Sequence, residues 1–297
     1  MIKAKKEKQV NYFAIAIAVV LALYAISMIV PIFWTLLTTI KLPLEYDNIN
    51  KLWLPKMGVT FQNYITAFTH FKVKIDTVSG STLSYDIFAQ FFNSILYSVG
   101  CAFTTTAASM VMAYATARFK YKLSGIIYTF VLVALALPIV GSMPSEIAVA
   151  QGLGIFDTFP GIWIMRATFL NTYFLIFYAQ FKSIAYDYTE AAKIDGASPF
   201  TIMFKIIVPL AFGTIISVFV LNFIAYWNDF QIPMVYIPSH PVAAYGMYKF
   251  QDYRTIEIDS DTTRLSGIVL MALPIVIFYA FFNQRLNVNM ADGGVKG

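Results

Sequence analysis

Few residues in this chain have the types and spacing that covalent chemistry requires. Its single cysteine, Cys101, cannot form an internal disulfide, and its two histidines, His70 and His240, are too far apart in sequence to suggest a zinc or iron site. We interpret both histidines as solvated loop residues. The sequence contains no GxxxxGK[ST] phosphate loop, no His-Glu helical metal pair and no nucleophile elbow. It therefore predicts no enzyme, and no metal or cofactor bound by the chain itself.

The residues best suited to contact another protein lie at 187–210, a moderately polar segment between two long apolar runs. Asp187 and Glu190 have the spacing of a capping box, with Asp187 as the N-cap, and predict a short helix. Gly196 supplies a left-handed residue to end that helix, and Ser198-Pro199 starts a second one. The segment is too polar to span a bilayer, so we expect an ordered loop shaped as a plug.

The first helix of this loop has the composition of a docking element. Ala191, Ala192 and Ala197 remove side-chain bulk, so a partner's groove could approach the backbone closely, while Glu190 and Asp195 offer charges to that partner. A second interpretation makes Glu190 a solvated carboxylate that the helix dipole stabilises. The two interpretations are compatible, because a dipole-stabilised carboxylate can still form a salt bridge.

The spacing within this loop is that of a known motif. Glu190-Ala191-Ala192, three residues, Gly196, nine residues, Ile206 and then Val208-Pro209 resembles the EAA loop of binding-protein-dependent ABC importers. Val208 replaces the usual leucine, and Ala185 stands where many relatives carry proline. Neither departure touches the charged or glycine positions, and the resemblance covers nearly the whole chain.

The resemblance implies a type I ABC importer permease, an all-α integral membrane protein whose cytoplasmic EAA helices dock on ATPase subunits. It implies that Glu190 forms a salt bridge with an ATPase arginine and that Gly196 sets the turn. Pro209 would then mark where the loop joins the fifth span. Closure of the ATPase subunits on ATP and Mg²⁺ would move the loop as a rigid lever.

Two further stretches resemble the carbohydrate branch of these importers. Tyr226-Trp227-Asn228-Asp229 matches the WN pair that is usual in carbohydrate permeases. The glycine-rich end of the chain resembles the tail of the maltose-type branch, which reaches toward the ATPase interface. The residues that carry this second resemblance are Gly293, Gly294 and Lys296.

Composition places the chain in a bilayer. Of its 297 residues 59% are hydrophobic and only 12% are charged, too few polar groups to cover a soluble globule of this size. The net charge of +5 comes from lysines and arginines in short loops between apolar runs. That distribution is typical of membrane topology and argues against a nucleic-acid-binding face.

Apolar runs long enough to cross a bilayer predict six transmembrane helices, the first of them an uncleaved anchor. Short interfacial helices are expected near residues 61–71. The face that holds both termini, the turn at Arg118 and the loop at 187–210 has the denser positive charge, so we expect it to be cytoplasmic, in the bacterial inner membrane. The predicted spans are residues 12–39, 88–117, 124–143, 161–181, 206–226 and 265–282.

These spans suggest four parts of the chain. Residues 1–11 form a cytoplasmic N-terminus, and residues 12–87 hold the first span and an outer loop. Residues 88–284 form the ABC transmembrane domain with five helices, and residues 285–297 form a cytoplasmic tail.

A passage for sugars should offer aromatic faces and groups that hydrogen-bond to hydroxyls near the middle of the bilayer. Each candidate side chain has a second interpretation, as a contact between helices or an interfacial belt residue. The candidates are Asn93, Asn171, Tyr173, Asn222, Tyr226, Trp227 and Asn228.

Arg166 lies within an apolar run that otherwise lacks charge, where an arginine needs a partner. It could extend to the outer interface, pair with Glu146 or Asp157, or act as a cavity cation that attracts an acidic sugar such as a uronate. The outer loop at 231–264 also has two interpretations. It could face an extracytoplasmic solute-binding protein, or it could be a lid packed on its own helices.

Together these patterns predict one half of a heterodimeric import pore for an oligosaccharide. The expected partners are a second permease, two ATP-binding subunits that hydrolyse ATP, a solute-binding protein and lipid. A permease for amino acids or peptides and an ion-driven sugar transporter are the alternatives, with a membrane glycosyltransferase as a more distant one. The WN pair argues against the first, and the near absence of carboxylates in the spans argues against the second.

Overall fold

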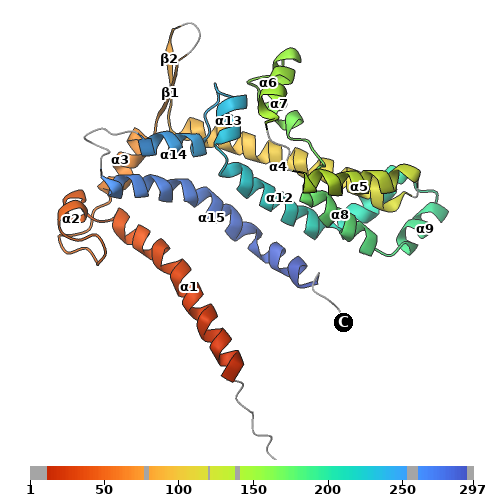
Figure 1. Cartoon of the computed structure of the whole chain (residues 1–297), viewed down its shortest axis with the longest axis horizontal. Helices are drawn as coiled ribbons and strands as arrows, with labels where there is room; N and C mark the ends of the chain where they lie inside the picture. The colour runs from red at the N-terminus through yellow and green to blue at the C-terminus, as the bar shows by residue number, and fades with distance from the viewer. Residues whose placement is uncertain (1–11, 77–79, 120, 138–140, 253–259, 293–297) are drawn as a thin grey trace, which may run out of the picture. The chain divides into compact units, whose positions relative to one another are not determined.

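A computed structural model describes residues 12–76, 80–119, 121–137, 141–252 and 260–292, with side chains up to Phe281. The elements are mostly α-helices (Figure 1). The chain divides into two compact units, residues 1–70 with 253–270 and residues 71–252 with 271–297. Each unit is described by itself below.

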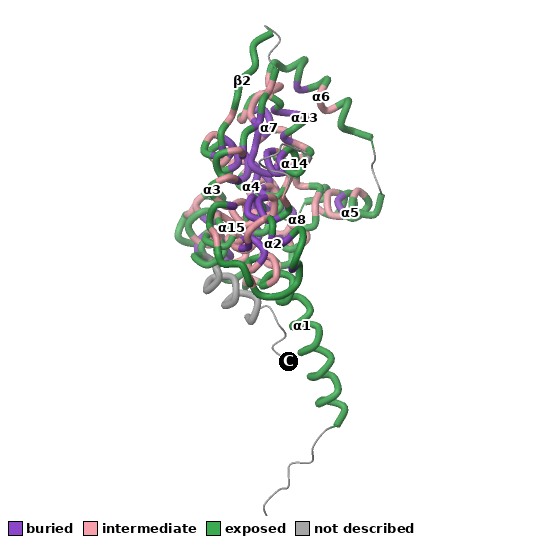
Figure 2. Tube along the Cα trace, turned by 90° about the vertical axis from the view of Figure 1, so that its left-hand side faces the viewer, coloured by how far each residue is buried: buried purple, intermediate pink, exposed green. Residues whose placement is uncertain are grey.

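The first unit is built on one long helix. The helix predicted for the first span is confirmed as α1 (Tyr12–Thr39), and only its last two residues, Thr38 and Thr39, are buried. Figure 2 shows that most residues of this helix are exposed, in green. A connection with α2 (Pro43–Asn48) leads to α3 (Gln62–His70), which lies where an interfacial helix was expected. Because α1 is apolar and almost entirely exposed, its surface is suited to contact with lipid or with another protein.

The second unit is organised around α4 (Ile87–Arg118), which agrees with the second predicted span. Asp86 caps its N-terminus by accepting a hydrogen bond from the amide of Ala89. Helices α8 (Thr172–Ser183) and α12 (Phe212–Trp227) pack along α4. Before α4, the strands β1 (Val73–Asp76) and β2 (Thr82–Tyr85) form an antiparallel hairpin that the sequence analysis did not predict.

Shorter helices fill the remaining connections, and a π-helix, η1, follows α10. Their bounds are α5 (Lys122–Ala136), α6 (Met143–Gly152), α7 (Phe159–Met165), α9 (Asp187–Ile194), α10 (Pro199–Ile202), η1 (Met203–Ile207), α11 (Val208–Leu210), α13 (Gln231–Tyr236), α14 (Ala243–Asp252) and α15 (Asp261–Asp292).

Within the described residues, three helices have the length and composition to cross a membrane: α1, α4 and the part of α15 at Asp261–Phe281. A fourth candidate is the pair Pro199–Leu210 and Phe212–Trp227, which meet at an angle of 77°. Three predicted spans need correction. The third is shorter, because α5 ends at Ala136, and the fourth is not continuous, because α7 and α8 are separate helices. The fifth, predicted as residues 206–226, is bent at Ala211, so its straight part is α12 alone.

Candidate functional site

The loop at 187–210 forms two short helices, as predicted, but the first of them starts one residue earlier than expected. Helix α9 begins at Asp187, but Tyr186 is its N-cap and no side chain caps it, so the predicted capping box is wrong. The amide of Glu190 is already bonded to the Tyr186 carbonyl. The C-terminal prediction is confirmed: Gly196 has φ +76°, and the Ala197 amide donates to the Ala192 carbonyl at 2.9 Å.

The second helix of the loop starts as its sequence indicates. Ser198 has extended backbone geometry, and its hydroxyl accepts from the Thr201 amide, while Pro199 occupies the first helical turn. The helix continues through η1 and α11 and ends at Leu210, and at Ala211 the chain bends by 77° into α12. Pro209 lies two residues before that bend, so it marks the junction between the loop and the following helix.

The tip of this loop exposes polar and apolar side chains together. Glu190, Ala191 and Asp195 are exposed, whereas Ala192 is buried. Sequence reasoning missed the apolar part of the tip: Ile194 is 86% exposed and Phe200 is 75% exposed. A signal was present, because both are large apolar residues beside charged or capping residues in a loop. Exposed apolar groups of this kind usually mark a contact surface.

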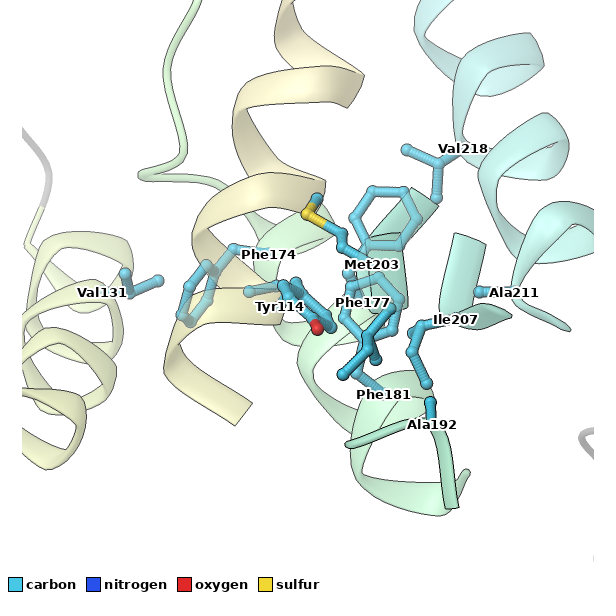
Figure 3. Packing of buried hydrophobic residues seen from close by; sticks show 12 residues of the cluster. Tyr114, Val131, Phe174, Phe177, Phe181, Ala192, Met203, Ile207, Ala211 and Val218 are labelled. Carbon is cyan, nitrogen blue, oxygen red and sulfur yellow. The ribbon is translucent and has the colours of Figure 1, made fainter. Parts of the chain in front are cut away.

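The base of the loop packs tightly on the rest of the second unit. Ile202 and Ile207 are buried with Phe177 and Phe181 of α8 and Tyr114 of α4. Figure 3 shows these aromatic rings from α4 and α8 directed toward the loop residues Met203, Ile207 and Ala192. Because close-packed interiors deform little, the loop is expected to follow any movement of the helices beneath it.

Arg118 ties the end of α4 to the start of the loop. Its guanidinium donates to the carbonyls of Ile184 at 3.0 Å and Ala185 at 3.4 Å, and it lies over the ring of Tyr186 at 5.6 Å. These carbonyls follow the C-terminus of α8, where a cation is electrostatically favoured. The sequence analysis used Arg118 only as a topology marker, so this contact is new.

A second polar site lies farther toward the N-terminus of α4, where hydroxyl groups face the gap between α7 and α8. Thr105 donates to the Arg166 carbonyl at 2.8 Å, and Ser109 donates to the Asn171 side chain at 3.0 Å. Asn171 in turn caps α8 by accepting from the Phe174 amide. Non-helical backbone inside a membrane needs such partners. The threonine and serine of α4 therefore explain how the predicted fourth span can be broken.

Arg166 has the partner that one interpretation of the sequence assigned to it. Its guanidinium lies 2.9 Å from the carboxylate of Glu146 on α6 and over the ring of Tyr236 on α13 at 5.0 Å. Tyr236 also donates a hydrogen bond to the same carboxylate. Asp157 bonds elsewhere, to the Ser239 amide. The ion pair thus joins three separate helices.

The surroundings of this pair shift two pKa values. Burial favours the protonated form of Glu146, but hydrogen bonds from Tyr236 and Ser142 and the charge of Arg166 outweigh it, so the pKa of Glu146 is lowered. Burial, followed by the hydrogen bond to Glu146, raises the pKa of Tyr236 to about 12. The carboxylate is therefore charged and the phenol neutral at physiological pH.

The segment carrying the WN pair contributes a third set of contacts. Tyr226 shares a hydrogen bond of 2.9 Å with Thr105, and its ring meets that of Tyr97 edge to face at 5.7 Å. Tyr97 donates to Asp229 at 2.8 Å, and the other oxygen of Asp229 accepts from the amides that begin α13. Asp229 and Tyr97 were not predicted as site residues. Their signal was a polar group within an apolar helix for Tyr97 and directly after one for Asp229.

The other predicted pathway residues are engaged within the second unit. Asn93 donates to the Pro241 carbonyl at 3.0 Å, and Asn222 donates to Thr106 at 3.2 Å. Trp227 is 2% exposed and packs against Phe91 and Phe223. Two candidates are more accessible. Tyr173 is half-buried, and Asn228 is exposed and bonded to its own helix.

The described part of the outer loop packs on its own helices. The Ala243 amide donates to Ser94 at 2.7 Å, and the Asp157 amide donates to the Tyr236 carbonyl at 3.0 Å. Gly246 allows α14 to approach the side chain of Gln90 more closely than a Cβ would permit. These contacts favour an ordered lid. The tail residues Gly293, Gly294 and Lys296 lie outside the described residues.

Comparison with protein families identifies one whose model matches more than half of the chain. Residues 105–291 match the model of the binding-protein-dependent transport system inner membrane component. A diacetylchitobiose uptake system permease protein from Streptomyces coelicolor is 26% identical over 284 residues, covering 95% of this chain and 88% of the relative. A probable starch degradation products transport system permease protein from Thermoanaerobacterium thermosulfurigenes is 29% identical, covering 96% of this chain and 97% of the relative.

A further relative and a solved structure agree with these matches. An arabinooligosaccharides transport system permease protein from Bacillus subtilis is 25% identical, covering 97% of this chain and 98% of the relative. A chain in the crystal structure of a bacterial ABC transporter involved in the import of alginate, an acidic polysaccharide, superposes with a TM-score of 0.75. Its identity is 22%, and the match covers 95% of this chain and 99% of that one. The structural match shows a shared fold.

Proposed function

Because the chain belongs to the family of binding-protein-dependent transport system inner membrane components, we propose that it forms one half of the pathway of an ATP-driven sugar importer. In this proposal six spans cross the membrane, and both termini and the loop at 187–210 are cytoplasmic. The chain binds no cofactor itself. Its partners are a second permease, two ATPase subunits that use ATP and Mg²⁺, and an extracytoplasmic solute-binding protein.

The observation that carries this proposal is the form of the loop at 187–210. Its tip presents exposed charges, Glu190 and Asp195, next to exposed apolar groups, Ile194 and Phe200. Its base is packed against α4 and α8 through buried aromatic rings. A tip of this kind can enter a partner's cleft, and a base of this kind can pass the partner's movement to the helices. Both properties are required of a coupling element.

An oligosaccharide is the substrate class that the relatives support. Three of them are named as permeases for diacetylchitobiose, starch degradation products and arabinooligosaccharides. The polar groups where the middle of α4 meets α12, including Thr105 and Tyr226, are of the type that can exchange hydrogen bonds with sugar hydroxyls. Arg166 is already paired with Glu146, so a uronate could bind this arginine only by displacing that carboxylate. The proposal therefore does not require an acidic sugar.

Charge reversal at the tip tests the coupling. We expect Glu190→Lys to lower co-purification with the ATPase subunits and to reduce substrate-stimulated ATP hydrolysis tenfold or more, because it replaces a salt bridge with repulsion. The measurement uses the complete importer in vesicles, with its solute-binding protein and a panel of oligosaccharides. Asp76→Lys is the matched control, since Asp76 is also an exposed carboxylate but lies in the hairpin before α4.

The outcome that would contradict the proposal is equally direct. If Glu190→Lys and Asp76→Lys hydrolysed ATP and transported sugar as the wild-type importer does, the loop would not be the coupling element. If the chain alone transported sugar without any ATPase, the proposal of ATP-driven import would be wrong.

A further inference from the structure

The connection between α1 and α3 buries three polar side chains and exposes three consecutive apolar ones. Lys41 and Glu45 are fully buried, and Asn50 is 6% exposed. By contrast, Leu52, Trp53 and Leu54 are 71%, 75% and 66% exposed. In a loop surrounded by water the opposite distribution is expected, because burying apolar groups is favourable and burying charge is costly. The stretch 52–54 is therefore suited to an apolar environment, and the charged side chains of Lys51 and Lys56 on either side of it are exposed.

The buried polar side chains bond to the backbone of the loop. Glu45 accepts from the amides of Lys56 at 2.7 Å and Met57 at 2.9 Å. Asn50 accepts from the amide of Trp53 and donates to the carbonyls of Trp53 and Leu54. These backbone amides and carbonyls, which would otherwise need hydrogen bonds from water, are therefore bonded within the loop.

Further donors reach the same backbone from α1 and from Lys41, two residues after its end. The Lys41 ammonium donates to the carbonyls of Asn50 at 3.2 Å and Lys51 at 3.1 Å. The indole of Trp34 donates to the Lys51 carbonyl at 3.1 Å. Non-helical backbone can lie at membrane depth only where protein groups satisfy it in this way.

The position of the loop along α1 gives its depth. Leu52 and Trp53 form a groove with Val30, Pro31 and Trp34 of α1. These helix residues lie five to nine positions before Thr39, the last residue of α1. At a rise of about 1.5 Å per residue, they are roughly 8–14 Å inside the end of the helix. Because α1 is a candidate membrane span, the loop folds back alongside its apolar part.

We propose that residues 50–57 form an interfacial membrane loop, and that its groove against α1 binds an acyl chain of a bilayer phospholipid. Leu52, Trp53 and Leu54 lie at the boundary between headgroups and acyl chains, in the leaflet at the C-terminal end of α1. Trp53, which is 75% exposed, supplies the aromatic group that favours this depth, and Lys51, whose ammonium lies 5.7 Å from the Tyr46 ring, is placed beside the headgroups. The proposal depends on the membrane location of α1 and not on what the protein transports.

Spin labelling of single cysteines tests this depth. Cys101 is buried, so it reacts little, and Cys101→Ala removes it from the background. Labels are placed at Leu52→Cys and Leu54→Cys in the full chain, within the importer in phosphatidylcholine and phosphatidylglycerol vesicles. Leu23→Cys, on the exposed surface of α1, is the lipid reference, and Ser84→Cys, in the exposed part of β2, is the water reference.

We expect labels at Leu52 and Leu54 to collide with oxygen several-fold more than with a water-soluble nickel chelate, as at Leu23 but at shallower depth. Chelate access equal to that at Ser84 would overturn the proposal, because the loop would lie in water. Protection from both reagents would also overturn it and would indicate that a protein subunit covers the loop.

Native fluorescence gives an independent measurement without a label. Phosphatidylcholine brominated at carbons 6 and 7 should quench the wild-type chain more than Trp53→Phe, and phosphatidylcholine brominated at carbons 11 and 12 should show a smaller difference. Equal quenching of the wild-type chain and Trp53→Phe by the shallow lipid would contradict an interfacial position for this side chain.

Discussion

The two ends of α4 are held by different kinds of contact. At its C-terminal end, Tyr114 packs against Phe177, Phe181 and Ile207, with little polar contribution apart from Arg118. In its N-terminal half and middle, Tyr97 donates to Asp229 before α13, Ser94 accepts from the Ala243 amide at the start of α14, and Thr105 donates to the Arg166 carbonyl just after α7. One helix therefore joins a close-packed apolar region to a region where hydrogen bonds are added to the apolar packing of residues such as Tyr97 and Cys101.

This difference separates two mechanical roles. Rearranging close-packed side chains costs free energy, because it opens cavities or forces atoms to overlap. The loop at 187–210 and the ends of α4 and α8 should therefore move as one body. A hydrogen bond contributes only about 0.5–1.5 kcal/mol net, because water or a sugar hydroxyl can replace the partner. The polar half of α4 is therefore where we expect rearrangement during transport. The predictions below test this division.

The largest effect is expected from truncation in the close-packed region. Phe177 is fully buried, so Phe177→Ala should lower the free energy of unfolding by about 3–5 kcal/mol, through lost transfer energy and the cavity left behind. Denaturant unfolding of the purified chain in mixed micelles measures this. Phe200→Ala is the matched control, because Phe200 is 75% exposed, and it should change stability by less than about 0.5 kcal/mol.

A loss below about 1 kcal/mol for Phe177→Ala would contradict the division, because the loop base would then be loosely packed. Phe200→Ala has a second readout, since its ring lies at the exposed tip. It should weaken association with the ATPase subunits although the chain remains stable.

An intermediate effect is expected from the ion pair of the polar region. Arg166→Ala should destabilise the chain by about 1.5–3 kcal/mol, the range for hydrogen bonds to charged groups, because it leaves the Glu146 carboxylate without its cation. A double-mutant cycle with Glu146→Gln isolates the pair, and the second substitution should cost much less in the presence of the first. Additive effects of the two substitutions would show that the pair contributes little.

The sequence predicted some elements well because their causes are local. The bounds of α1 and α4 follow from continuous apolar runs, and the turn at Gly196 follows from the one residue type that readily adopts a positive φ. Ser198 and Pro199 likewise act on the turn that follows them. In each case the interaction that sets the helix boundary or turn involves residues only a few positions away in the sequence.

Other predictions failed where distant residues decide the structure. The run at 161–181 is apolar enough to predict one helix. Instead the helix is interrupted, and Thr105 and Ser109 on α4 donate hydrogen bonds to polar groups of the interrupted segment. Asp187 is a good N-cap residue, yet the bond from Glu190 to Tyr186 starts the helix one residue earlier. The polar interior of residues 41–57 was also missed, because Glu45 and Asn50 look like ordinary loop residues until their backbone partners are known.

A smaller effect is expected from the turn in the coupling loop. A Cβ added at Gly196 would meet no atom, so Gly196→Ala tests only the left-handed backbone. The cost should be about 1–2 kcal/mol, and the α9 helix should fray at its C-terminus. Gly125→Ala is the control, since Gly125 also has open space but lies inside α5 with ordinary backbone angles, where alanine should stabilise slightly. Hydrogen exchange at the amides of Gly196 and Ala197 measures the fraying, and unchanged protection would contradict it.

The smallest effect is a dependence of stability on pH that belongs to the polar region alone. The folded-state pKa of Glu146 is lowered, so its contribution is complete above the unfolded value of about 4.3 and is lost as the pH falls through the folded value. Tyr236 has the opposite sign. Its pKa is raised to about 12, so its contribution is complete below the unfolded value of about 10 and is lost as the pH rises toward 12.

The difference in melting temperature between the wild-type chain and Glu146→Gln should therefore stay constant across neutral pH and shrink below about pH 4, because only the wild-type chain has a carboxylate at position 146 to protonate. The effect is modest, since the Glu146 side chain is 32% exposed and solvent screens the ion pair. Phe177→Ala provides the comparison: its difference from the wild-type chain should not depend on pH, because no titrating group is removed. A constant difference for Glu146→Gln down to pH 3 would mean that the carboxylate does not hold α6, α7 and α13 together.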